Sequence, residues 1–267
     1  FAHIFRREKI TAQILEGDSF HRFDRAGMRD RVARADSGEL PPITHFGPEA
    51  NLLADLETLF HNYGEAGTGR VRKYVHNTEE ADAYGAEAGT FTEWEEISAG
   101  TDLLFYEGLH GAFADSEVDV ARHVDLCIGV VPIINLEWIQ KLHRDSKQRG
   151  YAQEEVVDTI LQRMPDYVNH ICPQFSRTHV NFQRVPTVDT SNPFIAADIP
   201  SADESMVVIR FANPKGIDFP YLLSMLDGSW MSRPNNIVVP GGKMGLAMQL
   251  IFTPLIWRLM DKKRRAE

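Results

Sequence analysis

The stretch TAQILEGDSFHRFDR, residues 11–25, begins as an apolar run and ends in a dense group of charged side chains. The run TAQILEG predicts a strand that ends at Asp18. One short, turn-like segment then holds two aromatic residues, Phe20 and Phe23, among five titratable ones: Asp18, His21, Arg22, Asp24 and Arg25. A carboxylate, an imidazole and two guanidinium groups at the end of a strand indicate a ligand-binding edge of a sheet.

Apolar runs alternate with helical patterns along the rest of the chain. Strands are predicted over residues 11–17, 102–108, 125–131, 178–189 and 205–211, and the second and third of these are continuous enough to be buried. Helices are predicted over residues 1–9, 49–65, 135–149, 154–171 and 246–260, with Asn135 as an N-cap and Pro165 as a bend. Strands separated by helices predict one α/β domain with a largely parallel sheet and helices on both faces. In such a fold Asp18 and Glu107 lie at the carboxyl ends of strands, where ligands bind.

Composition narrows the class of protein. The chain has 28 Lys and Arg against 38 Asp and Glu, a formal charge of −10, which argues against nonspecific binding to nucleic acid or to anionic membranes. Its apolar stretch 246–260 is too short to span a bilayer. The two cysteines, Cys127 and Cys172, show neither metal-ligand nor disulfide spacing, so a reducing cytoplasm is expected. The sequence contains no HExxH, GxSxG or GxGxxG motif, which argues against a zinc site, a serine hydrolase and a dinucleotide fold.

Two basic clusters are candidate anion sites. GRVRKYVH, residues 69–76, holds three cations, a tyrosine and a histidine, which fits either a solvated strand edge or contact with a phosphate and sugar hydroxyls. In KLHRDSKQRG, residues 141–150, Lys141, Arg144 and Arg149 share a helical face with Asp145. That pattern fits a salt-bridged helix surface, or three cations around a carboxylate that receive a polyphosphate and its metal ion.

Two further carboxylates have alternative roles. Glu107 ends the run LLFYE, directly before Gly108. It is either an ordinary acidic residue at a strand end, since many strands end in one, or a Walker-B-like acid that holds Mg²⁺. Asp18 is either a helix cap after a strand or the base that accepts a proton from an attacking hydroxyl.

Many blocks in order resemble bacterial phosphoribulokinases. They include EGDSFHRF, THFGPEAN, GRVRKYVH, LLFYEGLHG, VVPIINLEWIQKLHRDSKQRGY, PQFSRTHVNFQRVPTVDTSNPFIA, ADESMVVIRF and GSWMSRPNNIVVPGGKM. The resemblance implies an α/β, P-loop kinase-like, three-layer fold, similar to adenylate and uridine kinases, with a mixed, mainly parallel sheet flanked by helices. It implies phosphorylation of the C1 hydroxyl of D-ribulose 5-phosphate by MgATP, giving ribulose 1,5-bisphosphate for the Calvin cycle.

The resemblance also implies roles for individual residues. Asp18 would be the catalytic base, Asp145 a second essential carboxylate near Mg²⁺, and Glu107 the Walker-B acid. Lys141 and Arg144 would stabilise charge on the transferring phosphoryl group. The sugar phosphate would be held by His21, Arg25, Tyr74, His76 and Arg149.

Regulation and assembly are implied in the same way. The bacterial enzymes are cytoplasmic oligomers, typically octamers, activated by NADH and inhibited by AMP, and Arg7, Arg210 and Arg233 match arginines of that effector site. The alternative for these three arginines is a surface or interface salt bridge. Leu15 stands near a regulatory cysteine of the plant enzymes, so thiol control is not expected.

The sequence departs from the family pattern at its start. No G-x-x-x-x-G-K-[ST] loop occurs in the 267 residues, and the family pattern puts it about two dozen residues before Phe1. We therefore expect residues 1–267 to be a single phosphoribulokinase domain without its first strand and P-loop. Gln162 also replaces one of two expected arginines, beside Arg163. Two other hypotheses stay open: a uridine- or pantothenate-kinase-like enzyme, and a non-catalytic subunit that binds a sugar phosphate or an effector nucleotide.

Overall fold

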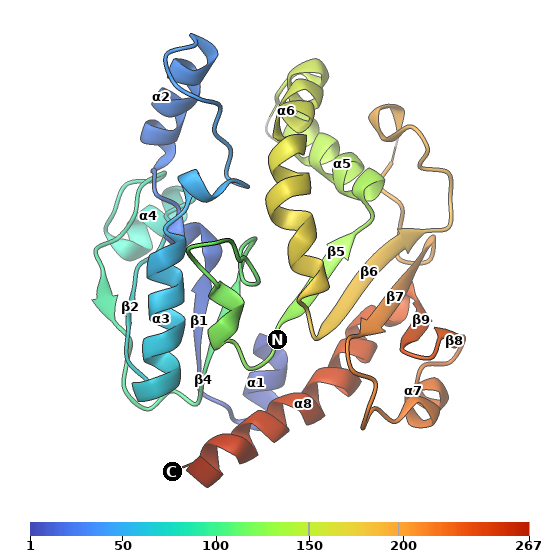
Figure 1. Cartoon of the computed structure of the whole chain (residues 1–267). Coiled ribbons are helices and arrows are strands. Elements are labelled where there is room, and N and C mark those ends of the chain that lie inside the picture. Colours follow the sequence, from blue (N-terminus) through green and yellow to red (C-terminus); the bar gives the residue numbers. More distant parts are fainter. Residues whose placement is uncertain (149, 197, 267) are drawn as a thin grey trace. The chain divides into compact units, whose positions relative to one another are not determined.

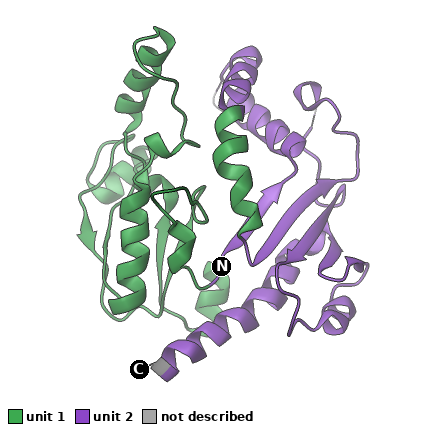
Figure 2. Cartoon of the chain, in the orientation of Figure 1, with its two compact units in different colours: residues 1–125, 165–177 green, residues 126–164, 178–267 purple. Residues whose placement is uncertain are grey.

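The computed structural model describes residues 1–148, 150–196 and 198–266. The chain forms two compact units, the first of residues 1–125 and 165–177 and the second of residues 126–164 and 178–267 (Figure 2). Within the described ranges, no helix has both the length and the apolar character needed to cross a membrane. The two units are described separately below.

The first unit is built on two parallel strands, β1 (Ala12–Glu16) and β4 (Leu103–Glu107). Leu15 and Tyr106 are register partners on one face, where α3 (Leu53–Ala66) packs its leucines and Phe60. Phe105 points to the other face and meets the ring of Phe5 from α1 (Ala2–Glu8) at 5.4 Å. The strand pair is therefore covered by a helix on each face, because successive strand side chains alternate in direction.

Shorter elements surround this pair in the first unit (Figure 1). After β1 come a 3-10 turn, Gly17–Phe20, and α2 (Arg25–Asp36), whose N-cap Asp24 accepts a hydrogen bond from the Gly27 amide at 2.7 Å. Further elements are the antiparallel strands β2 (Arg70–Val71) and β3 (Glu95–Glu96), the helix α4 (Thr78–Tyr84), the π-helical turn Tyr167–Ile171 and the 3-10 turns Pro48–Ala50, Val120–His123 and Cys172–Ser176.

The second unit contains a five-stranded mixed sheet in the order β5-β6-β7-β9-β8. Its strands are β5 (Ile128–Pro132), β6 (Val180–Pro186), β7 (Ser205–Phe211), β8 (Trp230–Arg233) and β9 (Asn236–Pro240). β5 and β6 are parallel, and the other three pairs are antiparallel. Antiparallel neighbours need no crossover helix, and among the described residues between β6 and β7 the one helical element is the 3-10 turn Pro193–Ile195.

Helices of the second unit place its charged cluster and cover its sheet. α5 (Ile134–His143) follows β5 directly and continues into a π-helical turn, Arg144–Gln148. α8 (Met244–Ala266) packs Phe252 against Phe182 of β6, with ring centres 5.3 Å apart, and α7 (Phe219–Met225) packs Phe219 against Phe211 of β7. α6 (Gln153–Asp166) contains the boundary between the units, at Pro165, and is followed by a π-helical turn, Tyr167–Ile171.

Most predicted elements are present, and the predicted α/β class with a mixed sheet and flanking helices is confirmed. Two predictions are wrong, one about a helix cap and one about the burial of two strands. Asn135 is not an N-cap, because the cap position is Ile133 and the side-chain amide of Asn135 donates to the Thr190 carbonyl at 2.8 Å. The strands over 102–108 and 125–131 are not fully buried, and the Val130 side chain is 53% exposed. That the whole chain acts as a single domain stays a prediction.

Candidate functional site

The carboxyl ends of β1 and β4 bring three carboxylates together in the first unit. Glu16 and Glu107 are register partners at the two strand ends, and Asp18 follows Glu16 in the 3-10 turn. Asp18 is not a helix cap, because the cap of this turn is Glu16 and no side-chain cap bond is formed. Its side chain is 47% exposed, so the carboxylate is available to a ligand.

Two glycines allow the two chain segments behind these carboxylates to touch. A Cβ atom on Gly17 would lie 2.8 Å from Cα of Gly108, and a Cβ on Gly108 would lie 2.8 Å from Cα of Gly17. The Tyr106 hydroxyl lies beside both, and burial raises the pKa of Tyr106, which keeps the phenol protonated. Neither glycine could become alanine without moving a backbone that carries an acidic side chain.

Two histidines lie beside Asp18. Nε2 of His21 is 3.5 Å from one Asp18 oxygen, and Nε2 of His76 is 3.9 Å from the other. The same His76 nitrogen is 3.9 Å from a Glu16 oxygen. The structure therefore brings three of the predicted site residues, Asp18, His21 and His76, into one group.

His21 is neutral at physiological pH. Burial, together with the nearby His110, His76 and Arg72, lowers the pKa of His21 to about 4. Its ring lies against the His45 ring at a tilt of 34°, with centres 4.3 Å apart, and is edge-on to the Tyr74 ring at 6.3 Å. A neutral imidazole can both donate and accept a hydrogen bond, which suits a sugar hydroxyl next to a carboxylate.

Arg25, at the start of α2, joins this group through the backbone. Its guanidinium donates to the His76 carbonyl at 2.9 Å, and its amide donates to the Gly89 carbonyl at 2.9 Å. Gly89 has φ +92° and lies against the arginine: a Cβ there would be 3.1 Å from the Arg25 Cβ and 3.2 Å from its Nε. Tyr74 stands 4.9 Å from the His76 ring, so the predicted sugar-phosphate residues of this unit are neighbours.

Glu107 has the environment of a cation ligand. Burial, Asp18 and Glu16 raise the pKa of Glu107, since each disfavours a further negative charge. A divalent cation would offset that repulsion, and carboxylate oxygens are ligands that Mg²⁺ prefers. Among the described residues, no group of three or more His, Cys, Asp or Glu side chains could hold a metal ion. Mg²⁺ that is bound by one or two carboxylates, waters and nucleotide phosphates needs no such group.

The second unit holds the other predicted cluster, around Asp145. Asp145 is 5% exposed, accepts a short hydrogen bond from Lys141, and accepts another from Nε of Arg144 at 3.1 Å. Burial opposes ionisation of Asp145, but the hydrogen bonds from Lys141 and Arg144 outweigh it, so the net pKa is lowered. Burial lowers the pKa of Lys141 although Asp145 acts in the opposite direction. A solvated salt-bridged surface does not describe this cluster, because its carboxylate is buried.

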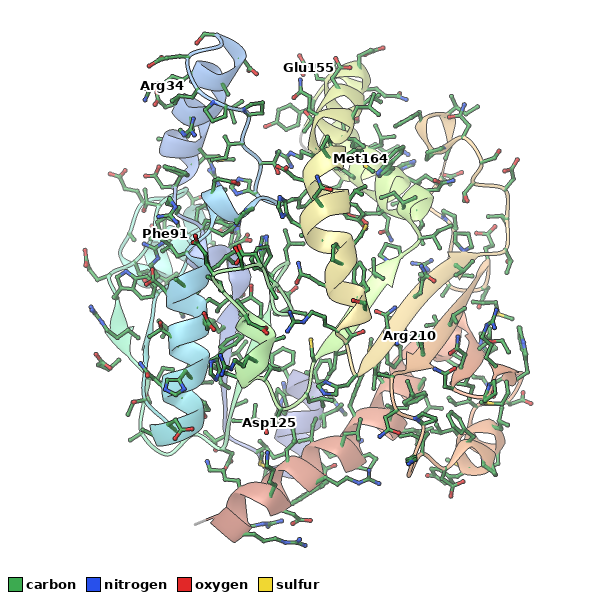
Figure 3. The ribbon with its side chains drawn as sticks, in the orientation of Figure 1. Arg34, Phe91, Asp125, Glu155, Met164 and Arg210 are labelled. Carbon is green, nitrogen blue, oxygen red and sulfur yellow. The ribbon has the colours of Figure 1, made fainter. Side chains whose placement is uncertain are left out.

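Other predicted residues fall outside these two groups. Arg149 lies outside the described residues. Arg7 belongs to the first unit, where its Nε contacts Glu8 at 2.6 Å. Arg210 on β7 and Arg233 on β8 are both register partners of Asn236 on β9, so in the second unit two of the three predicted effector arginines lie on either side of this strand (Arg210 in Figure 3).

The structure adds residues that were not predicted as site residues. Glu16 lies beside His76, and Gly89 lies against Arg25. Arg72 donates to the backbone of the segment that follows Asp18. Arg72 lies in the predicted basic cluster 69–76, and its charge was the one sequence signal available. Gly89 has no local signal, because its contact with Arg25 joins positions 64 residues apart in the chain.

Comparisons with known proteins show the family of this chain. The family model described as Phosphoribulokinase / Uridine kinase family matches residues 1–191. A phosphoribulokinase of Cupriavidus necator, described as the plasmid form, is 65% identical over 266 residues, which is 100% of this chain and 91% of the relative. A phosphoribulokinase of Nitrobacter vulgaris is 60% identical over 266 residues, covering 100% of this chain and 92% of the relative.

A solved structure has the same fold as this chain. The structure titled phosphoribulokinase from Rhodobacter spheroides superposes with a TM-score of 0.91 at 58% identity, covering 99% of this chain and 92% of that chain. The predicted kinase class and its α/β fold are confirmed by these matches. The chain belongs to the phosphoribulokinase / uridine kinase family.

Proposed function

We propose that the full-length protein transfers the γ-phosphoryl group of ATP to the C1 hydroxyl of D-ribulose 5-phosphate, forming ribulose 1,5-bisphosphate. The observation that carries the proposal is Asp18, a half-exposed carboxylate at the end of β1 with the imidazoles of His21 and His76 within 3.9 Å. The relatives named phosphoribulokinase, at 60–65% identity over nearly all of this chain, support this acceptor.

In the proposed reaction Asp18 accepts the proton of the C1 hydroxyl while the C1 oxygen forms a bond to the γ-phosphorus of ATP. The bond between that phosphorus and the β,γ-bridging oxygen breaks, and ADP leaves. His21, Tyr74 and His76 orient the sugar through its hydroxyls. Arg25 and Arg149 bind the phosphate that the substrate already carries, since guanidinium groups match phosphate oxygens in geometry and charge.

Roles are also proposed for residues of the second unit. Lys141 and Arg144 offset the negative charge on the transferring phosphoryl group, and Asp145 orients both cations. Glu107 and Asp145 are the proposed protein ligands for Mg²⁺, which when bound to the nucleotide neutralises part of the phosphate charge.

The allosteric effectors, the oligomeric state and the cellular location are proposed from the same resemblance. We propose NADH as an activator and AMP as an inhibitor at a site that includes Arg7, Arg210 and Arg233, in a cytoplasmic homo-oligomer of eight chains.

An acceptor panel with one variant tests the proposed function. Full-length enzyme is assayed with ATP and ribulose 5-phosphate, uridine or pantothenate, and the Asp18→Asn variant is compared with Asp36→Asn, an exposed carboxylate on α2. We expect turnover of ribulose 5-phosphate alone, a fall in kcat of about 10²–10⁴-fold for Asp18→Asn, and no change for Asp36→Asn. Turnover of uridine instead, or no turnover of any acceptor by a folded full-length protein, would overturn the proposal.

A further inference from the structure

Arg72 holds the turn that carries Asp18 and His21. Arg72 directly follows β2, more than 50 positions away from that turn in the chain. Its Nε donates to the Ser19 carbonyl at 2.8 Å, and a terminal nitrogen donates to the His21 carbonyl, also at 2.8 Å. One guanidinium group thus bonds the backbone on both sides of Phe20, immediately after Asp18.

Two aromatic rings hold the guanidinium group of Arg72 in place. Its central carbon lies 3.6 Å from the centre of the Phe91 ring and 4.7 Å from that of the Trp94 ring (Phe91 in Figure 3). Trp94 in turn meets Phe20, the buried residue of the turn, edge-on at 5.6 Å, and Phe91 meets Tyr74 edge-on at 5.3 Å. The guanidinium of Arg72 therefore lies against the two rings, Phe91 and Trp94, that also contact Tyr74 and the turn.

The chemistry of this contact requires an arginine. A planar guanidinium can lie flat against a ring while its edge donates to two separate carbonyls, whereas a lysine ammonium offers a point charge on a flexible stem. Both carbonyls of the turn accept from the same rigid group, so their spacing is set by the guanidinium. A change at residue 72 would therefore alter the position of Asp18 and His21 without touching either side chain.

We infer that Arg72 is a positioning residue for phosphoryl transfer, which sets the backbone of the Ser19–His21 segment and through it the Asp18 carboxylate and the His21 ring. The inference rests on the proposed function, because it assigns the turn a role in that reaction. Arg72 itself does not contact the reacting atoms in this assignment.

The test compares Arg72→Lys with Arg70→Lys in the full-length enzyme. Arg70 lies on β2, two residues before Arg72, is 62% exposed and pairs with Glu96 at 3.7 Å, so its variant makes the same chemical change away from the turn. We expect Arg72→Lys to lower kcat by about 10²-fold, as a misplacement of about 1 Å does, and to raise the KM for ribulose 5-phosphate while the KM for ATP is unchanged. Arg70→Lys should leave all three constants at their wild-type values.

A merely structural role predicts a different result. Arg72→Lys would then lower the thermal midpoint while kcat per folded enzyme stayed at the wild-type value, and that outcome overturns the inference. If Arg72→Lys does not fold, the Trp94→Phe variant is measured instead, because it keeps a ring against Phe20 and weakens the contact with the guanidinium. A several-fold lower kcat of this variant supports the inference, and an unchanged kcat overturns it. Wild-type enzyme that does not phosphorylate ribulose 5-phosphate refutes the proposed function itself, whatever the variants do.

Discussion

Replacing Gly89 by alanine tests whether the Arg25 guanidinium is held in one position for phosphate binding. The new Cβ would lie 3.1 Å from the Arg25 Cβ and 3.2 Å from its Nε and Cζ, closer than ordinary van der Waals contact. The arginine must therefore yield by a few tenths of an ångström. Since a misplacement of about 1 Å can cost about 10²-fold, we expect the KM for ribulose 5-phosphate to rise roughly 3–5-fold.

Backbone strain accompanies this contact and needs its own control. Residue 89 has φ +92°, which L side chains rarely adopt, so Gly89→Ala should also cost about 1–3 kcal/mol of stability. Gly85, which ends α4, has φ +67° and no atom within 4 Å of the position of a Cβ. Gly85→Ala should therefore lower stability by about 1–2 kcal/mol and leave the KM unchanged.

Steady-state kinetics and thermal unfolding of the two full-length variants separate the effects. In an Arg25→Ala background, Gly89→Ala should raise the KM no further, because the group that it displaces is gone. The reasoning is refuted if Gly89→Ala loses stability but keeps the wild-type KM, or if Gly85→Ala raises the KM as much as Gly89→Ala does.

Three further predictions concern pH, burial and charge. The folded-state pKa of His21 is about 4, against 6.5 for the ordinary group, so between these pH values the unfolded chain binds a proton that the folded chain does not. The free energy of unfolding should therefore fall by about 3 kcal/mol as pH drops from 6.5 through 4. His21→Asn should remove most of that slope in urea unfolding measured across this range, and an unaltered slope would contradict the assignment. Asn51, 2% exposed, donates to the carbonyls of His45 and Gly47 at 3.0 and 2.7 Å, so Asn51→Ala should cost about 2–4 kcal/mol in urea unfolding; a cost below about 0.5 kcal/mol would show that these bonds contribute little. Lys141→Met should lower kcat about 10²-fold and leave the KM for ribulose 5-phosphate unchanged in steady-state assays, and a kcat near wild type would exclude its role in charge stabilisation.

The order of the elements could be predicted because the signal is local. The apolar runs 11–17 and 205–211 and the leucine spacing of 49–65 each produce their element within a few residues of the predicted bounds. The placement of Asp18 and Glu107 at strand ends also follows from these runs alone. Sequence reasoning failed where a long-range contact decides: the Asn135 amide bonds Thr190, 55 positions away, instead of capping its own helix.

The chemistry of the site was also read from residue types and motif order. The family comparisons confirm the kinase class, and the roles of the base, the cations and the sugar-binding residues stay predictions. The residues that hold these side chains in place were not predictable, because arginine and glycine occur in many unrelated settings.

By itself, the sequence determined the α/β class, the alternation of strands and helices, and a chemistry of carboxylates and cations suited to phosphate. Only the tertiary structure decided that Gly17 meets Gly108 behind the carboxylates, that Arg72 bonds the turn after Asp18, and that Asp145 is buried between Lys141 and Arg144. The physical reason is that propensity and periodicity act over a few residues. Close packing and hydrogen-bond satisfaction act between segments that meet only after the chain has folded.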